Sequence, residues 1–461
     1  MGTGVALSLW PPVSQNSFYN SYKPCLIEGP KWFILKTVRG LLTFTMLDAV
    51  MWVLYAIVLY ISFFLLITLF DEGSIRPELK DLEEIPTLSL IIPAYNEEET
   101  IEMTIDSALD IDYPRDKYDI IVVNDGSTDS TLEKAKKFEE NENVTIIDKE
   151  NGGKGSALNA GVKESDSDVV ACVDADSILK EDSLKHMVAE MGDEYAGVAS
   201  AMKVYEPENI LQKLQWVEYI VGIFTRNIMG LMNAIHVTPG PLSVYRRDRL
   251  MEIGMFDEDS LVEDQEICFR LQEEHYKIGH SSKAEVYTVA PSTWEEFKAQ
   301  RYRWYRGSLE TAIQYKHMLF NRDYGDLGVF AIPGKLAQTF LSLIVLFITA
   351  YMFGRPIIEF LIEFAQLGLY VFDFDPVTIS SLIDQAYWTL ISIRFTSFFF
   401  IAALFTTSVT MAWFASKHTE ENILEYGVLP VLMYLMFFVF INGYLWLRVM
   451  ISMLKGAERT W

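Results

Sequence analysis

Two acidic residues at the end of an apolar run offer the first candidate chemistry. The run VVACVDADS, from Val169 to Ser177, ends with Asp174 and Asp176. A short Val-rich run without helical spacing predicts a buried strand of a parallel sheet. Residues two apart in an extended chain point to the same side, so the two carboxylates can converge at the carboxyl end of this strand. Such oxygen ligands suit Mg²⁺ or Mn²⁺ shared with substrate phosphates. The alternative is a solvated acidic turn, and this short motif alone does not decide between the two.

Two glycine-containing turns carry further polar groups. The turn NDGSTD, residues 124–129, places Asp125 just past a predicted strand, where its carboxylate can accept hydrogen bonds from a nucleobase or a ribose. The alternative is an Asx-type turn with a helix N-cap. The stretch NGGKGSALNAG, residues 151–161, surrounds Lys154 with glycines before a predicted helix, so this cation can reach a diphosphate. The alternative is a mobile surface loop, because neither the P-loop nor the dinucleotide-binding spacing fits.

Two later stretches could act on an acceptor. Glu263 and Asp264 come immediately before a predicted helix, where acids usually serve as caps, but a carboxylate facing a bound diphosphate could also take a proton from a hydroxyl. Residues 293–307, TWEEFKAQRYRWYRG, hold a cationic and aromatic cluster within two helical turns: Gln300, Arg301, Arg303, Trp304 and Arg306. Guanidinium groups pair with diphosphate oxygens, and an indole can stack on a sugar ring. The alternative is a helix at a membrane interface.

The elements that must position these groups alternate between strands and helices. Strands are predicted at Leu88–Ile92, Asp119–Val123, Val144–Ile147 and from Val169, with a fifth, short strand at Leu242–Tyr245 after a rigid turn at residues 239–241. Strand, helix and strand in succession predict right-handed crossovers and a mostly parallel sheet. All the polar turns then fall on the same carboxyl edge.

Composition places this α/β domain between membrane segments. The chain has 461 residues, half of them hydrophobic, and a formal net charge of -25. That charge argues against nucleic acid as a partner, since phosphates require a basic face. Three widely separated cysteines suit a reducing compartment without a disulfide framework. By length and hydropathy, the segments are residues 1–43 (N-terminal, at the membrane interface), 44–70 (one span), 71–292 (soluble α/β domain), 293–326 (interfacial helices) and 327–461 (membrane region with spans at 327–353, 386–413 and 429–452).

Seven motifs, in this order and spacing, resemble the membrane-bound family 2 glycosyltransferases. They are IIPAYNEEETI, VVNDGSTDST, GGKGSALNAG, VDADS, GPLSVYRR, VEDQE and QRYRW. The sequence is similar to the hyaluronan, chitin, nodulation-oligosaccharide and poly-N-acetylglucosamine synthases. The resemblance implies a GT-A fold inserted between transmembrane helices, a nucleotide-diphosphate-sugar donor (a UDP-sugar), a divalent cation (Mg²⁺ or Mn²⁺) and inversion at the anomeric carbon.

The resemblance also assigns roles to individual residues. By this resemblance, Tyr95, Glu97 and Asp125 bind the nucleotide, and Lys154 contacts the donor. Asp174 and Asp176 bind the uridine diphosphate and the metal. Asp264 becomes the general base, and Gln300, Arg303 and Trp304 close the site around diphosphate and acceptor. The chain departs from many relatives at Asn124, where they carry a first aspartate. No gating-loop motif follows Gly307, so processive elongation is less firmly implied than glycosyl transfer.

The expected function is therefore synthesis of a β-linked polysaccharide coupled to membrane export. Expected partners are the nucleotide sugar, a saccharide or lipid-linked acceptor, and membrane lipids. The alternatives are transfer of one sugar to a lipid carrier or glycolipid, and a non-catalytic membrane scaffold. We expect a multi-pass plasma-membrane protein with its catalytic domain facing the cytoplasm, where nucleotide sugars occur. The positive-inside rule opposes this orientation, because four basic residues between 23 and 39 precede the first predicted span and only two closely follow it.

Overall fold

A computed structural model describes residues 84–367 and 395–456, together with Trp52, Ala56 and Leu59. The predicted N-terminal segment, most of the span at 44–70 and residues 386–394 lie outside the described residues. The chain divides into two compact units, Met1–Tyr60 with Glu363–Leu404, and Ile61–Ile362 with Phe405–Trp461. The second unit contains the sheet domain.

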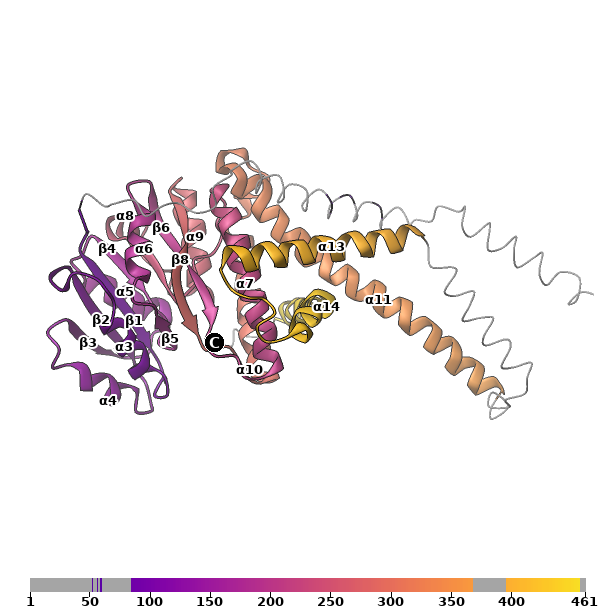
Figure 1. Ribbon diagram of the computed structural model, residues 1–461, viewed down its shortest axis with the longest axis horizontal. Helices are drawn as coiled ribbons and strands as arrows, with labels where there is room; N and C mark the ends of the chain where they lie inside the picture. Colours follow the sequence, from indigo (N-terminus) through magenta and orange to yellow (C-terminus); the bar gives the residue numbers. More distant parts are fainter. Residues whose placement is uncertain (1–51, 53–55, 57–58, 60–83, 368–394, 457–461) are drawn as a thin grey trace, which may run out of the picture. The chain divides into compact units, whose positions relative to one another are not determined.

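One mixed, mostly parallel sheet forms the centre of the second unit (Figure 1). Its eight strands follow the order β3-β2-β1-β4-β7-β6-β8-β5. The strands are β1 (Leu88–Ala94), β2 (Tyr118–Asp125), β3 (Val144–Lys149), β4 (Val169–Cys172), β5 (Ser177–Leu179), β6 (Tyr195–Val204), β7 (Ser243–Arg246) and β8 (Lys277–Thr288). Strands β3, β2, β1 and β4 run parallel, as predicted. Strand β7, the predicted short strand shifted by one residue, pairs antiparallel with both β4 and β6.

Helices cover both faces of this sheet. The described helices of the chain, which include those that cover the sheet, are α3 (Ile101–Leu109), α4 (Thr131–Ala135), α5 (Lys154–Glu164), α6 (Ser183–Met191), α7 (Ile210–Leu231), α8 (Arg247–Glu252), α9 (Glu263–Glu273), α10 (Trp294–Gln314), α11 (Ile332–Leu367), α13 (Phe395–His418) and α14 (Val428–Leu454). Short turns of helix lie at Arg115–Lys117, Lys136–Phe138, Lys316–Met318, Arg322–Tyr324 and Leu327–Ala331. Alternate side chains of β1 face opposite layers, because Leu90 and Ile92 join the core cluster that includes α3 and α6, whereas Ile91 joins the cluster with α5 and α9.

Strands β1 to β4 all end elsewhere than the sequence predicts, since β2 continues to Asp125, β3 continues to Lys149, and β1 and β4 also differ. Strand β4 ends at Cys172, so Asp174 and Asp176 lie in a turn and not in an extended segment. The amide of Ser177 closes this turn by donating to the Asp174 carbonyl over 3.1 Å. Strand β1 continues through Pro93 to Ala94. Its pairing with β4 ends at Ile91, so no ladder hydrogen bond to β4 requires the N–H that Pro93 lacks.

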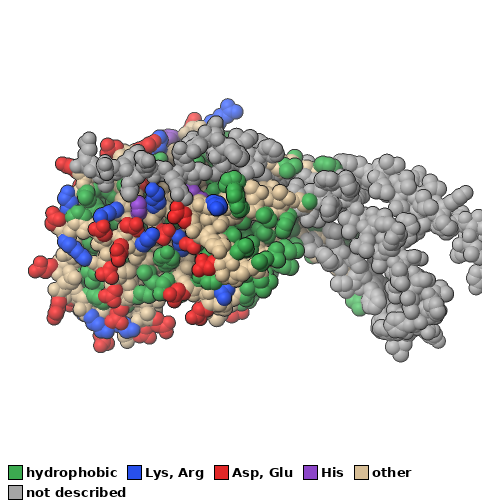
Figure 2. All heavy atoms as spheres, in the orientation of Figure 1, with side chains coloured by type: hydrophobic (Ala, Val, Ile, Leu, Met, Phe, Trp, Pro, Cys, Tyr) green, Lys and Arg blue, Asp and Glu red, His purple; other side chains and the backbone are tan. Residues whose placement is uncertain are grey.

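Two described helices are long and apolar enough to cross a membrane, at Leu327–Ile348 and Val428–Leu454. They coincide with the predicted spans at 327–353 and 429–452. Both helices expose large apolar side chains, among them Phe347 of α11 and Phe437 of α14, and Figure 2 shows hydrophobic side chains gathered apart from the charged surface. Helix α13 covers residues 395–418 of the region predicted to hold the remaining span.

Helix α10 packs directly against α14. The Tyr305 ring stacks on Trp446 with centroids 4.6 Å apart, and its hydroxyl donates to Asn442 Oδ1 over 2.7 Å. Helix α14 in turn approaches α11 closely, since a Cβ at Gly443 would lie 2.7 Å from the Ser342 carbonyl oxygen. The helix that carries QRYRW is therefore fixed to a helix of membrane-spanning length.

The buried Lys203 yields a stability prediction. Its ammonium lies 2.7 Å from Glu285 and 2.6 Å from Glu421, and its side chain is only 5% exposed. Because Lys203→Ala leaves Glu421 without this cation and Glu285 with only the more exposed Lys180, 3.3 Å away, we expect the free energy of unfolding to fall by about 3 kcal/mol. The control Lys277→Ala breaks an exposed pair with Glu194 and should cost about 1 kcal/mol or less. Denaturant unfolding in detergent compares the two variants, and equal losses would contradict the prediction.

Candidate active site

Lys154 lies at the centre of the polar groups on the carboxyl edge of the sheet. It is the first residue of α5, and its ammonium lies 2.5 Å from Asp174 Oδ1 and 2.7 Å from Glu263 Oε1. Burial lowers the pKa of Lys154, but the charges of Asp174, Glu263 and Asp264 outweigh burial and raise that pKa above its ordinary value. One cation thus joins the turn after β4, the start of α5 and the start of α9.

Asp264 lies beside this bridge and is free to react. Lys154, Asp174, Gly240, Glu263 and Asp264 line one common cavity. The Asp264 carboxylate has no hydrogen-bond or ion-pair partner among the described residues, whereas its main-chain oxygen accepts from the Thr238 hydroxyl over 3.1 Å. Burial and the neighbouring charge of Glu263 raise the pKa of Asp264 to about 7, against the opposing effect of Lys154. A carboxylate of this kind can accept a proton near neutral pH.

Glu263 and Asp264 are the first two residues of α9, whereas the sequence predicted them immediately before the helix. Burial raises the pKa of Glu263, but the Lys154 and Arg303 charges exceed this effect and lower the pKa overall. Adjacent carboxylates therefore differ in character, since Glu263 is held ionised by Lys154 and Asp264 is poised to titrate.

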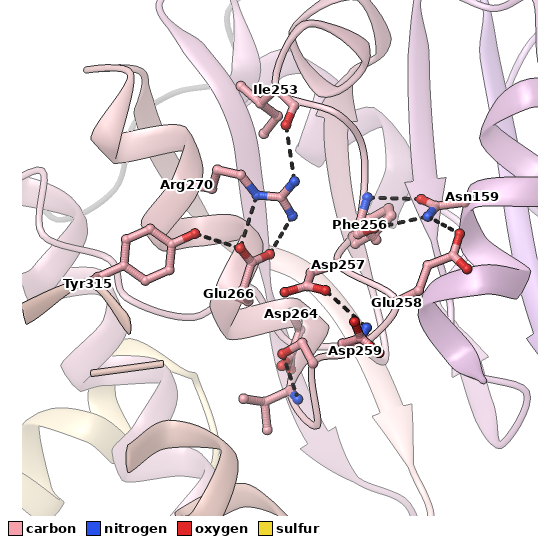
Figure 3. A network of polar contacts seen from close by, with 12 residues as sticks. Asn159, Ile253, Phe256, Asp257, Glu258, Asp259, Asp264, Glu266, Arg270 and Tyr315 are labelled. Atoms are coloured by element: carbon pink, nitrogen blue, oxygen red, sulfur yellow. Dashed lines mark hydrogen bonds and ion pairs between the residues drawn. The ribbon is translucent and has the colours of Figure 1, made fainter. Parts of the chain in front are cut away.

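A polar clamp before α9 fixes its starting point. The side-chain amide of Asn159, on α5, donates to the Phe256 carbonyl and to Glu258 Oε1, each over 2.9 Å (Figure 3). Its oxygen accepts from the Phe256 amide, also over 2.9 Å. The loop before Glu263 is thereby tied to the helix that begins with Lys154.

A second clamp holds the next turn of α9. Glu266 accepts from Arg270 and from the Tyr315 hydroxyl, the latter over 2.6 Å, and Arg270 donates to the Ile253 carbonyl over 3.1 Å (Figure 3). Tyr315 follows α10 directly. The position of Asp264 therefore depends on contacts with α5 and with the end of α10.

Three carboxylates gather where β1 and β4 end. Burial, followed by the charges of Asp174 and Glu97, raises the pKa of Asp176 to about 7. Burial likewise raises the pKa of Glu97, with Thr100 opposing it and Asp174 adding to it. Mutually repelling carboxylates of this kind fit a divalent cation, which would remove the repulsion. Among the described residues, no group of three or more His, Cys, Asp or Glu residues could hold a metal ion.

Gly240, in the turn between Pro239 and Pro241, lies against Asp174 and Lys154. A Cβ at this position would lie 2.6 Å from Asp174 Oδ2 and 2.8 Å from the Lys154 ammonium. Only glycine allows the chain to approach these two groups so closely. The sequence indicates a rigid turn here, but it does not reveal the close approach of Gly240 to Asp174 and Lys154.

Asp125 holds the glycine loop that precedes Lys154. Its Oδ1 accepts from Lys149 and from the Gly152 amide, and its Oδ2 accepts from the Gly153 amide over 2.8 Å. Gly153 has a φ of +87°, which favours glycine. The structure thus gives Asp125 a positioning role toward the loop, while its contact with a nucleotide stays a prediction. Tyr95, 48% exposed just after β1, presents an open ring on the same edge.

The cationic cluster of the QRYRW segment divides into separate roles. Arg301 forms a two-pronged ion pair with Glu218 of α7, both contacts 2.6 Å long, and its guanidinium lies 4.5 Å from the Trp304 ring centroid. Arg306 pairs with Glu310 over 3.1 Å. Arg301 and Arg306, which belong to the cationic cluster noted in the sequence, thus form ion pairs within the protein, whereas the role predicted for Arg303 stays a prediction.

Two members of this segment remain available to a ligand. Arg303 influences the pKa values of both Glu263 and Asp264, and no ion pair of its guanidinium occurs among the described residues. Gln300 has a buried side-chain oxygen without a hydrogen-bond partner in the described region. Trp304 is half-buried, with Arg301 over its ring, so the predicted stacking on a sugar has no direct geometric counterpart here.

Gly307 is a further position that sequence reasoning missed. A Cβ there would lie 2.6 Å from Val262 Cγ2, in the residue just before Glu263. Glycine therefore lets α10 pack against the start of α9. Its signal in the sequence is an isolated glycine inside a helical pattern, which indicates close packing or a functional constraint.

The mixed, mostly parallel sheet, with Asp174 and Asp176 in the turn after β4, is the arrangement expected from the resemblance to family 2 glycosyltransferases. Residues 89–254 match the model of the family described as Glycosyl transferase family 2. The chain is 30% identical over 244 residues to the poly-beta-1,6-N-acetyl-D-glucosamine synthase of Staphylococcus aureus (strain COL), covering 52% of this chain and 58% of the relative. It is 30% identical over 237 residues to the protein of that name from Staphylococcus epidermidis, covering 50% of this chain and 57% of the relative. The match thus spans somewhat more than half the length of these curated relatives.

A solved structure shares the fold. It is a mannosyltransferase from Pyrobaculum calidifontis in complex with GDP-Man and Mn²⁺. The similarity has a TM-score of 0.50 at 19% sequence identity and covers 78% of this chain and 98% of that chain. This likeness confirms the predicted fold class.

Substitution of Gly240 tests the packing of the acid pair. We expect Gly240→Ala to weaken binding of a nucleotide diphosphate at least about tenfold. The new methyl group must push the Asp174 carboxylate or the Lys154 ammonium aside, and a misplacement of roughly 1 Å is costly in such a site. Isothermal titration with UDP and Mn²⁺ measures this affinity. The control Gly222→Ala, in α7, places its Cβ in open space and should bind as the wild type does. Unchanged affinity in Gly240→Ala would contradict the account.

Proposed function

We propose that this chain is an inverting glycosyltransferase that moves a sugar from a UDP-sugar to a growing β-linked polysaccharide. One observation carries the proposal: the Lys154 bridge brings Asp174, whose charge also acts on Asp176, beside the free carboxylate of Asp264. The first two groups suit a metal-bound diphosphate, and the third suits removal of a proton. An inverting displacement needs both within reach of one sugar.

The donor would bind along the carboxyl edge of β1, β2 and β4. Tyr95 and Glu97 lie at the end of β1 to receive the nucleotide, and Asp125 supports it through the loop before Lys154. Asp174 and Asp176 would hold Mg²⁺ or Mn²⁺, which when bound neutralises charge on the departing diphosphate. Lys154 would exchange its bond to Asp174 for one to the diphosphate.

Asp264 would act as the general base. It takes the proton of the acceptor hydroxyl while that oxygen attacks the anomeric carbon and the bond to the diphosphate breaks. Attack from the face opposite the leaving group converts an α-linked donor into a β-linkage. Arg303 and Gln300 would orient the diphosphate and the acceptor from α10, and Trp304 would border the acceptor.

The curated relatives support a polymer as the product. Both bear the name of a poly-β-1,6-N-acetylglucosamine synthase, so UDP-N-acetylglucosamine is the first donor to test. The two helices of membrane-spanning length, next to the site through α10, support a multi-pass plasma-membrane enzyme with its site on the cytoplasmic side. In that setting the product would leave through the membrane region.

The test uses the purified full chain in nanodiscs with labelled nucleotide sugars and Mn²⁺, and the products are resolved by size. We expect a high-mass ladder from one donor, and Asp264→Asn should reduce turnover by about 10²- to 10⁴-fold while donor affinity is kept. A single lipid-soluble product would favour transfer to a lipid carrier. Absence of turnover with every donor would favour a non-catalytic scaffold.

The pH dependence of turnover follows from the state of Asp264. Because burial raises the pKa of Asp264 to about 7, its active, ionised form predominates only above that pH. With saturating donor and Mn²⁺, we expect the rate to fall about tenfold per pH unit below pH 7 and to level off above it. Initial rates from pH 5 to 9 provide the measurement. A rate that stays constant from pH 5 to 8 would exclude Asp264 as the base.

Removal of one carboxylate from the acid cluster should have two opposite effects. Asp176→Asn relieves repulsion with Asp174 and Glu97, so the melting temperature without metal should rise. The same change removes a predicted metal ligand, so Mn²⁺-dependent binding of UDP should weaken at least about tenfold. Loss of a group that only hydrogen-bonds to a metal ligand already lowers metal affinity by about this factor. Thermal unfolding and calorimetry measure the two effects, and the exposed Asp106→Asn serves as control. UDP binding that responds to Mn²⁺ as in the wild type would contradict the assignment.

A further inference from the structure

A second cavity lies away from the Lys154 bridge, among α9, α10, α11 and α14. Its walls are largely apolar and include Phe269 of α9, Leu309 and Ala312 of α10, Leu336 of α11 and Trp446 of α14. Two of these helices, α11 and α14, contain the segments of membrane-spanning length. The proposed transfer reaction uses none of these apolar side chains.

A cationic group lies at one end of this cavity. Lys335, in the first turn of α11, and His236, in the loop before β7, both line it, and Lys335 Nζ lies 3.5 Å from His236 Nε2. No carboxylate pairs with Lys335 among the described residues, and the His236 Nδ1 atom is buried there without a hydrogen-bond partner. Lys335 and His236 thus line the same space, and the Lys335 ammonium has no carboxylate in contact among the described residues.

Arg226 of α7 increases the positive charge around this group. Burial, followed by the charges of Lys335 and Arg226, lowers the pKa of His236 to about 3, so the imidazole is neutral at physiological pH and remains a hydrogen-bond partner. Arg226 itself donates to the Ser200 carbonyl over 3.3 Å. The carboxylate that acts on Lys335 is Glu218, and Arg301 already engages it through two hydrogen bonds. Among the residues that the structure describes, Lys335 and Arg226 therefore have no carboxylate in contact, although the charge of Asp264 also acts on Arg226.

We propose that this cavity binds the phosphate head group of a membrane lipid, with the phosphate on Lys335 and His236 and an acyl chain along the apolar walls. Lysine binds phosphate as a point charge, and basic pockets between membrane helices bind lipid head groups. The apolar walls select a lipid over a free phosphate ion. The site requires neither the sugar donor nor Asp264, so the inference stands independently of the transferase mechanism.

Binding of labelled phosphatidic acid, a lipid phosphate monoester, provides the test. The purified full chain in phosphatidylcholine nanodiscs, without sugar donor, should bind this lipid in preference to phosphatidylcholine. Lys335→Gln should weaken the binding at least about tenfold, and Lys335→Arg should retain it because the charge is kept. The matched control Lys455→Gln removes an exposed lysine just past the end of α14 and should bind as the wild type does.

A second variant and a competitor separate the possible sources of phosphate. Leu336→Trp fills the apolar wall without changing charge and should also weaken phosphatidic acid binding, which keeps the test valid if Lys335→Gln does not fold. Inorganic phosphate at millimolar concentration should compete poorly. Equal binding by wild type and Lys335→Gln, or no preference over phosphatidylcholine, would overturn the inference. Full displacement by inorganic phosphate would assign the site to a free anion and would likewise overturn it.

Discussion

The site depends on one cation held between two carboxylates. Lys154 pairs with Asp174 on one side and with Glu263 on the other, where the Glu263 side chain is only 7% exposed. Five carboxylates meet around this point, from Glu97, the acid pair and the two acids of α9, while Lys154 and Arg303 are the positive groups acting on them. An anionic donor can approach such a site only with added positive charge, which is the physical reason to expect a divalent cation.

The strand and helix pattern of the sheet domain could be predicted because its signals are local. Val-rich runs followed by polar turns predicted β1 to β4, and the crossover rule predicted their parallel pairing, which the structure confirms. Because parallel strands end at one edge, the same reasoning placed Asp125, Lys154 and Asp174 close together. It did not show that Asp125 already binds the glycine loop, since that hydrogen bond depends on the path of the loop itself.

Contacts between distant segments could not be predicted from local patterns. Arg301 and Arg303 look equivalent in QRYRW, but a helical step of two residues turns them to different faces, and only Arg301 meets Glu218 of α7. The close contacts of Gly240 and Gly307 likewise join segments far apart in the chain. The antiparallel insertion of β7 beside β4 brings the Gly240 turn to the acid pair, and no rule of sequence periodicity specifies that pairing.

A structure of the full chain with UDP and Mn²⁺ tests the central claim most directly. We predict anomalous density for Mn²⁺ between Asp174 and Asp176, at the roughly 2.2 Å oxygen distances typical of such hard divalent cations. The Lys154 ammonium should leave Asp174 and contact the diphosphate, with the Asp264 carboxylate still free to face the acceptor side. An intact pair between Lys154 and Asp174, with nucleotide bound elsewhere and no metal at the acid pair, would contradict the account.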